Sequence, residues 1–415
     1  MQLSGDDHTL LETLKTEIAN VNATRIGVAV SGGGDSIALL LLLAALSADT
    51  NITVETITVD HGLREGSAEE AEFVQQTCKG LSVPHAIARW GAWNKSGNLQ
   101  AAARDARYRL IAEWAQRREL DVVCIGHTQD DVAETFLMRL GRESGVDGLA
   151  RMQSGFERNG VQFLRPLLDV SRESLRAYLR GKDQTWREDP SNENDAFGRV
   201  RARRALRVLD DIGLSSSALA QVAGNMADAK VTLQQATSRF AQSAVVEDAG
   251  DLLIDPAMFR LETVELRRRL LSAMLVWMVP SDYPPRRSAL AELDAAILDQ
   301  RTFSIGGCLV FSKAKEIRVT REFNAVRDLI EHSPNWDRWI ISGPWQVGME
   351  VRALGEPALA GLENWRDTGV KRQTLMASPS VWYDGQLVAA PLAGSYDGWQ
   401  ATLKSANFHE SLSSA

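Results

Sequence analysis

The stretch that decides the fold spans residues 26–36 and reads Ile26-Gly27-Val28-Ala29-Val30-Ser31-Gly32-Gly33-Gly34-Asp35-Ser36. Its β-branched first half predicts a strand, and the apolar run of residues 37–46 that follows predicts a buried helix. Glycines between a strand and a helix let backbone N–H groups converge on phosphate oxygens at the positive end of the helix. The stretch therefore predicts an anion-binding loop.

This loop matches neither of the two common nucleotide motifs. It lacks the Gly-x-x-x-x-Gly-Lys-Ser/Thr of a Walker A loop and the three-glycine spacing of dinucleotide folds. Asp35 would repel a phosphate in such a loop unless a divalent cation lay between them, so Asp35 predicts a magnesium ligand. The alternative is a glycine-rich connector with an Asp cap.

Short β-branched runs continue to alternate with helical stretches as far as about residue 167. Further strands are predicted at residues 53–59, 84–88 and 121–125, and an amphipathic helix at 101–118. This alternation is typical of an α/β fold with a Rossmann-like, doubly wound parallel sheet.

A chain of 415 residues is too long for one compact core, so we expect several domains. We place a phosphate-binding catalytic domain at 1–212, a helical middle domain at 213–326, and a small β-rich domain at 327–415. The last region holds six of the eleven tryptophans between regularly spaced turns. Tryptophans spaced in this way are more typical of a small core than of a base-stacking surface.

Composition indicates a soluble, folded protein, with 44% hydrophobic and 24% charged residues. The N-terminus has no secretory signal pattern, and the longest apolar run is too short to span a membrane, so we expect a cytoplasmic location. A net charge of −8 argues against a wholly basic nucleic-acid coat but allows a local basic track. Cys78, Cys124 and Cys308 form no CxxC pair, which argues against a disulfide framework, a zinc site or an iron–sulfur cluster.

Carboxylates gather after the fourth predicted strand. Asp130 can cap a helix, which would put Asp131 and Glu134 on one face. Two carboxylates facing a phosphate-binding loop suit a cationic substrate. The alternative is a solvated acidic first turn that complements the helix dipole.

Arginines gather in two places. Their planar forks suit phosphates, so these arginines are expected to bind a nucleotide or a nucleic-acid backbone. A salt-bridged surface helix is the alternative for the last two of the second group, and the triplet at 267–269 is a weaker candidate. The two groups are Arg104 and Arg107, and then Arg199, Arg201, Arg203, Arg204 and Arg207.

The glycine loop resembles that of the pyrophosphate-loop superfamily, whose members cleave ATP to AMP and pyrophosphate to activate a carbonyl oxygen. Six further segments resemble the tRNA(Ile)-lysidine synthases, in the same order: residues 60–64, 97–108, 126–135, 165–168, 189–192 and 197–203. The chain departs from the usual family pattern at Gln100, Val200 and Ala202. The match is close over about half of the chain and loose near the C-terminus.

The resemblance implies an enzyme that uses ATP and Mg²⁺ to adenylate the wobble cytidine of isoleucine tRNA with a CAU anticodon and then attaches free L-lysine. It implies Asp131 and Glu134 as lysine-binding residues, and Asp35, Asp131, Glu134, Arg104 and Arg107 as the catalytic set. One or two of the arginines would reach ATP, and those from Arg199 to Arg207 would bind tRNA. The domain at 1–212 would bind ATP, and the middle domain at 213–326 would bind tRNA. The sequence allows a homodimer. The implied ATP contacts are Ala29, Ser31, Gly32, Gly33, Gly34, Asp35, Ser36, Asp60, His61, Arg64 and His127.

Three rival functions share parts of this pattern. A tRNA thiolase of the same superfamily would use cysteine pairs or a persulfide carrier, which this chain lacks. An amide-forming NAD or GMP synthetase would not explain the acidic pair together with the arginine segment. A nucleotide-binding regulatory module without catalysis is the rival from another class.

Overall fold

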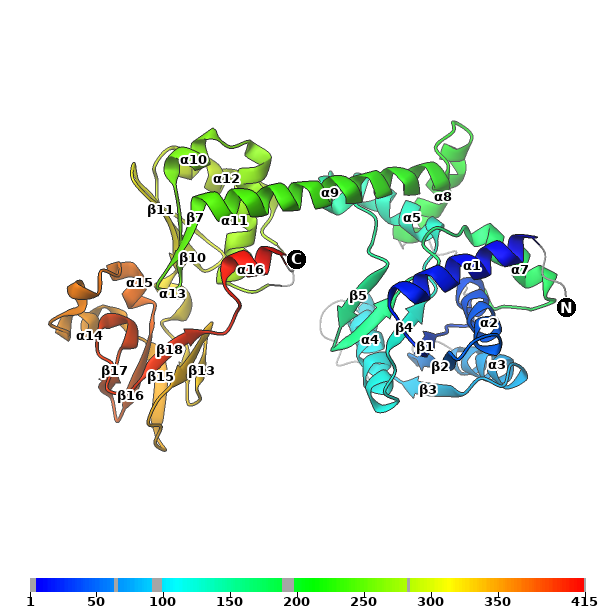
Figure 1. The fold of residues 1–415 in the computed structure, drawn as a ribbon, viewed down its shortest axis with the longest axis horizontal. Helices are drawn as coiled ribbons and strands as arrows, with labels where there is room; N and C mark the ends of the chain where they lie inside the picture. The colour runs from blue at the N-terminus through cyan, green and yellow to red at the C-terminus, as the bar shows by residue number, and fades with distance from the viewer. Residues whose placement is uncertain (1–4, 63–65, 92–98, 189–197, 282–283, 414–415) are drawn as a thin grey trace. The chain divides into compact units, whose positions relative to one another are not determined.

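The computed structural model describes residues 5–62, 66–91, 99–188, 198–281 and 284–413 (Figure 1). The chain divides into two compact units, Met1–Lys230 and Val231–Ala415. Arg64 and the segments 97–98, 189–192 and 197, which carry parts of the predicted motifs, lie outside the described residues.

The first unit is built on a six-stranded sheet with the order β3-β2-β1-β4-β6-β5. Five strands run parallel, and β5 pairs antiparallel to β6 at the edge. The sheet confirms the predicted doubly wound fold, whereas the β5–β6 hairpin was not predicted. The strands are β1 (Arg25–Ala29), β2 (Thr53–Asp60), β3 (His85–Arg89), β4 (Val122–Ile125), β5 (Gly155–Arg158) and β6 (Val161–Leu164).

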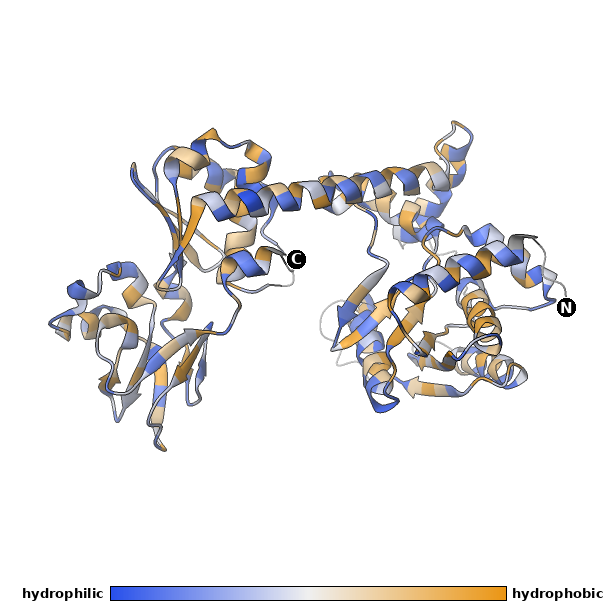
Figure 2. Ribbon diagram, viewed as in Figure 1, coloured by the Kyte–Doolittle hydropathy of each residue, from blue (hydrophilic) through white to orange (hydrophobic). Residues whose placement is uncertain are grey.

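Helices cover both faces of this sheet. One face packs against α1 (Gly5–Asn20), α2 (Gly34–Ala48), α3 (Ser67–Gly80) and α7 (Arg172–Gly181). The other face packs against α4 (Leu99–Arg117). Figure 2 shows α2 as hydrophobic along most of its length, as expected of a helix buried between the sheet and its neighbours.

A smaller helical layer completes the first unit. Apolar side chains of α5 (Gln129–Leu140), α8 (Gly198–Asp210) and the start of α9 (Ser216–Ala244) form one cluster, joined by α6 (Val146–Leu149). The arginine segment predicted from sequence is therefore a helix, α8, packed against the acidic helix α5.

The second unit begins with a five-stranded antiparallel sheet of order β7-β8-β11-β10-β9. Three helices, α10 (Pro256–Leu261), α11 (Val264–Met278) and α12 (Arg287–Leu298), share its core. The sequence predicted a helical middle domain here, with extended chain only at residues 306–319, so most of this sheet was not predicted. The strands are β7 (Val245–Asp248), β8 (Asp251–Ile254), β9 (Phe303–Ile305), β10 (Cys308–Ser312) and β11 (Ile317–Arg321).

Two small antiparallel sheets complete the second unit, with the orders β12-β15-β16-β17 and β13-β14-β18. Trp336 and Trp399 are fully buried in their shared core, as expected of tryptophans in a small domain. None of the described helices is both long and apolar enough to cross a membrane. The strands are β12 (Ile330–Glu331), β13 (Asn335–Trp336), β14 (Trp339–Ser342), β15 (Met349–Ala353), β16 (Pro379–Tyr383), β17 (Gln386–Ala389) and β18 (Gln400–Leu403).

Short helical segments lie between these strands or follow the last of them. They are α13 (Phe323–Val326), α14 (Gly355–Gly361), η2 (Trp365–Thr368), α15 (Arg372–Met376), η3 (Pro391–Ala393) and α16 (Phe408–Ser413).

Candidate active site

The predicted site residues gather at the carboxyl edge of the parallel sheet. Strand order reverses at β1, because β2 and β3 follow on one side and β4 on the other. In open α/β sheets, ligands bind outside the carboxyl ends of the strands at such a switch point. Here β1 leads into the glycine loop and β4 leads through Gly126 and His127 into α5.

The glycine loop is held in shape by its own serines. The Ser31 N–H donates to Ser36 Oγ over 3.2 Å, and Ser36 Oγ donates to the Gly33 carbonyl over 2.9 Å. Gly32 has a φ of +88°, a conformation that only glycine adopts readily. The loop opens α2, whose N-terminal N–H groups and dipole favour an anion.

Two neighbouring segments press on this loop. A Cβ at Gly126 would lie 3.1 Å from the backbone of Asp35 and Ser36, so the turn after β4 approaches too closely for a side chain. On another side, a Cβ at Gly34 would lie 3.4 Å from the Trp186 indole, and the Arg187 N–H donates to the Gly32 carbonyl over 2.9 Å. The phosphate loop is thus clamped between two segments distant in sequence.

The N-cap of the acidic helix α5 is Thr128, directly before Gln129, so the prediction that Asp130 caps the helix is wrong. Asp131 closes the first turn, because its Oδ2 accepts from the Thr128 N–H over 2.9 Å and from the Thr128 hydroxyl over 3.1 Å. Asp131 and Glu134 are buried, with side chains 8% and 0% exposed. They are therefore not a solvated surface turn.

Arg172, which no sequence motif singles out, joins the predicted carboxylates. Its guanidinium lies 3.1 Å from Asp35, 3.4 Å from Asp131 and 3.0 Å from Glu134. A basic residue in the first turn of a helix opposes the helix dipole, and this local conflict was a signal in the sequence that Arg172 has another role.

The pKa values in this cluster follow from burial and from Arg172. Burial raises the pKa of Asp35, and Arg172 only partly offsets that effect. For Asp131 burial acts in the same direction, but Arg172 and the Thr128 N–H help to hold the pKa below its usual value. Burial alone would lower the pKa of Arg172, yet the carboxylates outweigh burial and raise it. The arginine therefore stays charged.

Other arginines form a separate group around Tyr108 on α4. The guanidinium carbons of Arg104 and Arg107 lie 5.2 and 5.5 Å from the centre of the Tyr108 ring. Arg165, which directly follows β6, lies 4.0 Å over the Phe156 ring, and its buried Nε has no hydrogen-bond partner among the described residues. Burial lowers the pKa values of Arg107 and Arg165. This side of the edge suits an anion.

Histidines and Asp60 line the same edge. Burial lowers the pKa of His127 to about 4, so this ring is neutral at pH 7. Burial, and then Arg107, lower the pKa of His61, whose ring packs edge-on against Trp90 at a centroid distance of 5.8 Å. Asp60 Oδ1 accepts from the Gly62 N–H over 2.9 Å. The predicted ATP contacts thus follow neighbouring strands.

The predicted tRNA arginines divide on α8. Arg203 lies inward, with its Nε 2.6 Å from Glu134 Oε1, and so belongs to the carboxylate cluster. The exposed members are Arg199, Arg201, Arg204 and Arg207. Of the departures from the family pattern, the two on this helix, Val200 and Ala202, are both buried.

The weaker arginine candidates have structural partners in the second unit. Arg267 pairs with Asp294 over 2.8 Å, and Arg268 and Arg269 both pair with Glu265. All three cysteines are buried free thiols, and burial raises the pKa of each.

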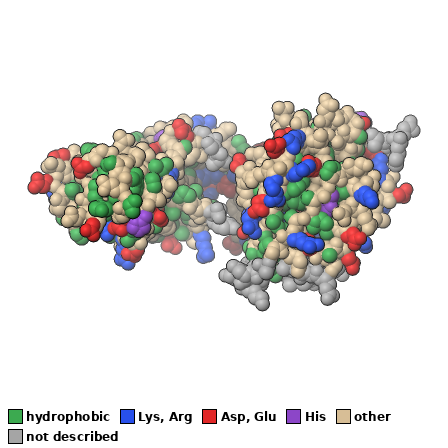
Figure 3. Space-filling view, turned by 90° about the horizontal axis from the view of Figure 1, so that it is seen from below, with side chains coloured by type: hydrophobic (Ala, Val, Ile, Leu, Met, Phe, Trp, Pro, Cys, Tyr) green, Lys and Arg blue, Asp and Glu red, His purple; other side chains and the backbone are tan. Residues whose placement is uncertain are grey.

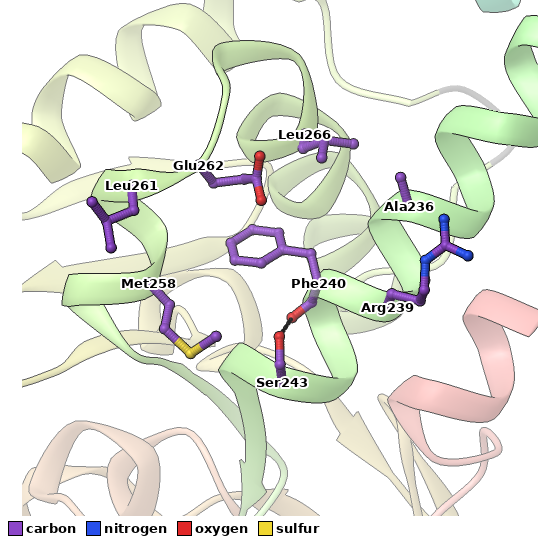
Figure 4. Close-up of a pocket in the computed structure, with 8 residues that line it drawn as sticks. All are labelled: Ala236, Arg239, Phe240, Ser243, Met258, Leu261, Glu262 and Leu266. Atoms are coloured by element: carbon purple, nitrogen blue, oxygen red, sulfur yellow. Dashed lines mark hydrogen bonds between the residues drawn. The ribbon is translucent and has the colours of Figure 1, made fainter.

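A cavity of about 450 Å³ lies between α9, α10 and α11 within the second unit (Figure 4). Its walls are mainly apolar, and it carries neither a glycine loop nor a carboxylate cluster. Its lining residues are Ala236, Arg239, Phe240, Ser243, Met258, Leu261, Glu262 and Leu266.

Comparison with known proteins agrees with this geometry. Residues 7–209 match the PP-loop domain family. The chain is 44% identical over 407 residues to the tRNA(Ile)-lysidine synthase of Ruegeria pomeroyi, with 97% of each chain covered. It is 33% identical to that of Wolbachia pipientis wMel, with 79% of each covered. Among solved structures, a U34-tRNA thiolase from Methanococcus maripaludis shares 15% identity at a TM-score of 0.47, covering 54% of this chain and 80% of the thiolase.

The identity over nearly the full length of the Ruegeria protein decides the assignment. The chain belongs to the tRNA(Ile)-lysidine synthase family, whose members are ATP-using enzymes that modify tRNA.

Proposed function

We propose that the protein joins free L-lysine to the wobble cytidine of isoleucine tRNA with a CAU anticodon, forming a carbon–nitrogen bond and releasing AMP and pyrophosphate. The observation that carries the proposal is the position of Asp35, in the helix that follows the glycine loop, beside the buried carboxylates Asp131 and Glu134. A phosphate-binding loop and an ammonium-binding pair therefore share one site.

In the first step, the C2 carbonyl oxygen of the cytidine attacks the α-phosphorus of ATP, and the bond to pyrophosphate breaks. The N–H groups of the glycine loop and the start of α2 stabilise the charge on the departing pyrophosphate. The base then carries AMP as a leaving group.

Asp35 is the residue that fits a magnesium ion, because its carboxylate is 22% exposed beside the phosphate loop. The described residues contain no group of three His, Cys, Asp or Glu side chains that could hold a metal ion. Mg²⁺ would therefore take most of its oxygen ligands from the ATP phosphates and water, and it would supply positive charge there.

In the second step, the lysine ε-amine loses a proton, attacks C2 and displaces AMP. Asp131 and Glu134 would hold the ammonium group before it loses that proton. Glu134 Oε2 supports this role, because it is buried and accepts no hydrogen bond from the residues that the structure describes. A buried carboxylate oxygen without a donor is costly, and an ammonium N–H would satisfy it.

The tRNA would approach along the arginines. Arg104, Arg107 and Arg165 suit a phosphate close to the reacting base, and the exposed arginines of α8 suit the backbone further away. Figure 3 shows Lys and Arg side chains spread over one face of the first unit. The cytidine must leave its stack to reach the site, which costs little in a single-stranded anticodon loop.

The decisive experiment is mass analysis of nucleosides from isoleucine tRNA after incubation with the protein, ATP and lysine. We expect a cytidine that has gained one lysyl group, with AMP and pyrophosphate formed in equal amounts. Product that forms without lysine, or that gains sulfur instead, would replace this proposal with the thiolase alternative. ATP binding without turnover would favour the regulatory module.

A further inference from the structure

Arg172 contacts both halves of the proposed site at once. Its Nε bonds to Asp35, which we assign to magnesium and ATP, and its Nη atoms bond to Glu134 and Asp131, which we assign to lysine. Its backbone N–H is fixed by Asp130 Oδ2 over 2.7 Å. No other described side chain pairs with all three of these carboxylates.

The contacts are unequal in a way that matters for an incoming amine. Glu134 Oε1 already accepts from Arg172 and Arg203, whereas Oε2 accepts from neither. Asp131 Oδ2 accepts hydrogen bonds from Thr128, and among the described residues its Oδ1 is contacted by Arg172 alone, at 3.4 Å. An ammonium group would therefore bind Glu134 Oε2 and compete with Arg172 for Asp131 Oδ1.

Charge gives this competition a direction. The guanidinium carries one positive charge, and both ligands expected at these carboxylates, magnesium and an ammonium group, are also cations. ATP would bring several negative charges to the loop beside Asp35, and phosphate oxygens are strong acceptors for arginine. Bound nucleotide would thus draw the guanidinium away from the carboxylates that the amine needs.

We propose that Arg172 is a positioning residue that makes lysine binding depend on bound ATP. Without nucleotide, the guanidinium occupies the carboxylates and lysine binds weakly. With nucleotide, it turns toward the phosphates and leaves Asp131 and Glu134 to the amine. By thermodynamic linkage, lysine then tightens nucleotide binding by the same factor. The inference rests on the proposed function of the two carboxylates.

The test measures binding alone. Labelled L-lysine is titrated onto the full chain by equilibrium dialysis, with and without Mg²⁺ and the α,β-methylene analogue of ATP, which cannot be cleaved between its α and β phosphates. We expect nucleotide to tighten lysine binding in the parent, on the order of tenfold. In Arg172→Gln, lysine binding without nucleotide should be tighter than in the parent, and nucleotide should add almost nothing.

Two further variants complete the design. Arg172→Lys keeps the charge but cannot span three carboxylates, so its coupling should be intermediate, and this variant decides the question if Arg172→Gln does not fold. Arg176→Gln is the matched control, because Arg176 lies on the same helix and pairs with the exposed Glu188 at 3.3 Å rather than with the three carboxylates. It should retain the coupling of the parent.

Failure of the proposed function and failure of the proposed role of Arg172 give different binding results. A parent that binds no lysine under either condition contradicts the proposed function itself. A parent that binds lysine while both Arg172 variants keep full coupling overturns the role of Arg172. The role is also overturned if Arg172→Gln weakens lysine binding equally with and without nucleotide, since that result describes a fixed support.

Discussion

Two buried clusters of arginine and carboxylates, one in each unit, resemble each other in chemistry and differ in accessibility. In the first unit, Arg172 joins Asp35, Asp131 and Glu134. In the second, Arg318 on β11 joins Asp251 and Asp248 of the β7–β8 hairpin over 2.8 and 2.7 Å. The side chains of Arg318 and Asp251 are only 4% and 3% exposed, whereas Arg172 and Asp35 are 17% and 22% exposed.

A buried ion pair therefore does not by itself mark a functional site. The Arg318–Asp251 pair ties antiparallel strands together and is sealed, with Thr374 donating a further hydrogen bond to Asp251, whereas Asp248 at the end of β7 is 41% exposed. The Arg172 cluster lies at the carboxyl edge of a parallel sheet beside a phosphate loop, and it opens to solvent at Asp35. The two clusters differ in their position in the fold and in their exposure to solvent. Mutation of the Arg172 cluster should therefore reduce activity, and mutation of the Arg318 cluster should reduce stability.

The largest effect is expected at Asp35. Asp35→Asn keeps the shape but removes the charge that would hold magnesium at the departing pyrophosphate, so adenylation should fall by roughly a thousandfold or more. Lysine-independent transfer of label from α-labelled ATP to tRNA measures it. Asp248→Asn, in the other cluster, should transfer label at the parental rate. Normal transfer of label by Asp35→Asn would show that Asp35 does not contribute to adenylation.

Arg318→Met should act on stability instead. It leaves Asp251 buried without its cation, and breaking a buried pair in this way costs about 3–5 kcal/mol. Burial already raises the pKa of Asp251, so the variant should take up a proton there on folding. Urea unfolding followed by tryptophan fluorescence checks the loss. An unchanged free energy of unfolding would mean that the Arg318–Asp251 pair does not stabilise the packing of these strands.

Asp131→Asn combined with Glu134→Gln should separate the two reaction steps. Losing the charged pair should weaken the binding of lysine by about 2–5 kcal/mol, which is well over tenfold, while adenylation continues. A quench experiment with α-labelled ATP should then show label accumulating on tRNA, whereas lysine should remove it in the parent. If adenylation stops and the lysine requirement is unchanged, the pair serves ATP or magnesium.

His127 offers a smaller test through pH. Its folded pKa of about 4 lies below the ordinary 6.5, so the unfolded state binds the proton more readily. The resulting stability is present above pH 6.5 and is lost as the pH falls toward 4, by about 2 kcal/mol between pH 7 and pH 5. His127→Gln should reduce that loss in urea unfolding. An identical pH dependence in the variant would show that His127 is not protected from protonation.

The smallest effect is expected on tRNA binding. Arg204 and Arg207 are exposed on α8, so replacing both with Gln should lower the salt slope of tRNA affinity by about 0.7 for each phosphate that the variant no longer binds. Arg268→Gln is the matched control, because Arg268 already pairs with Glu265 over 2.5 Å. Equal salt slopes for the parent and the double variant would show that these arginines do not bind tRNA phosphates.

The sequence predicted the parallel sheet and the glycine loop because both depend on short-range patterns. Four of the parallel strands and the helix after the loop lie within a few residues of their predicted bounds. It missed the β5–β6 hairpin and most of the β7–β11 sheet, where short strands follow one another without the regular alternation of strand and helix that marks the parallel sheet.

Arg172 could not be assigned from its own neighbours in sequence. Its contacts with Asp35, Asp131 and Glu134 join residues up to 137 positions apart in the sequence. They form because the fold of the parallel sheet places the starts of α2, α5 and α7 close together at its carboxyl edge. The cap of α5 was a local error, because Thr128 and Asp130 are both good N-caps and only the backbone decides between them. Arg203 was grouped with its neighbours by spacing, yet it faces inward to Glu134.

The Trp186 indole lies beside Gly34, where an added Cβ would be 3.4 Å from it, and this places a fluorescent group next to the phosphate loop. An indole changes its emission when the polarity beside it changes, and a nucleotide entering the loop brings such a change. The difference in fluorescence between the parent and a Trp186→Phe variant therefore isolates the signal of this one ring from the other ten tryptophans. Nucleotide occupancy can in this way be followed in real time without a labelled ligand.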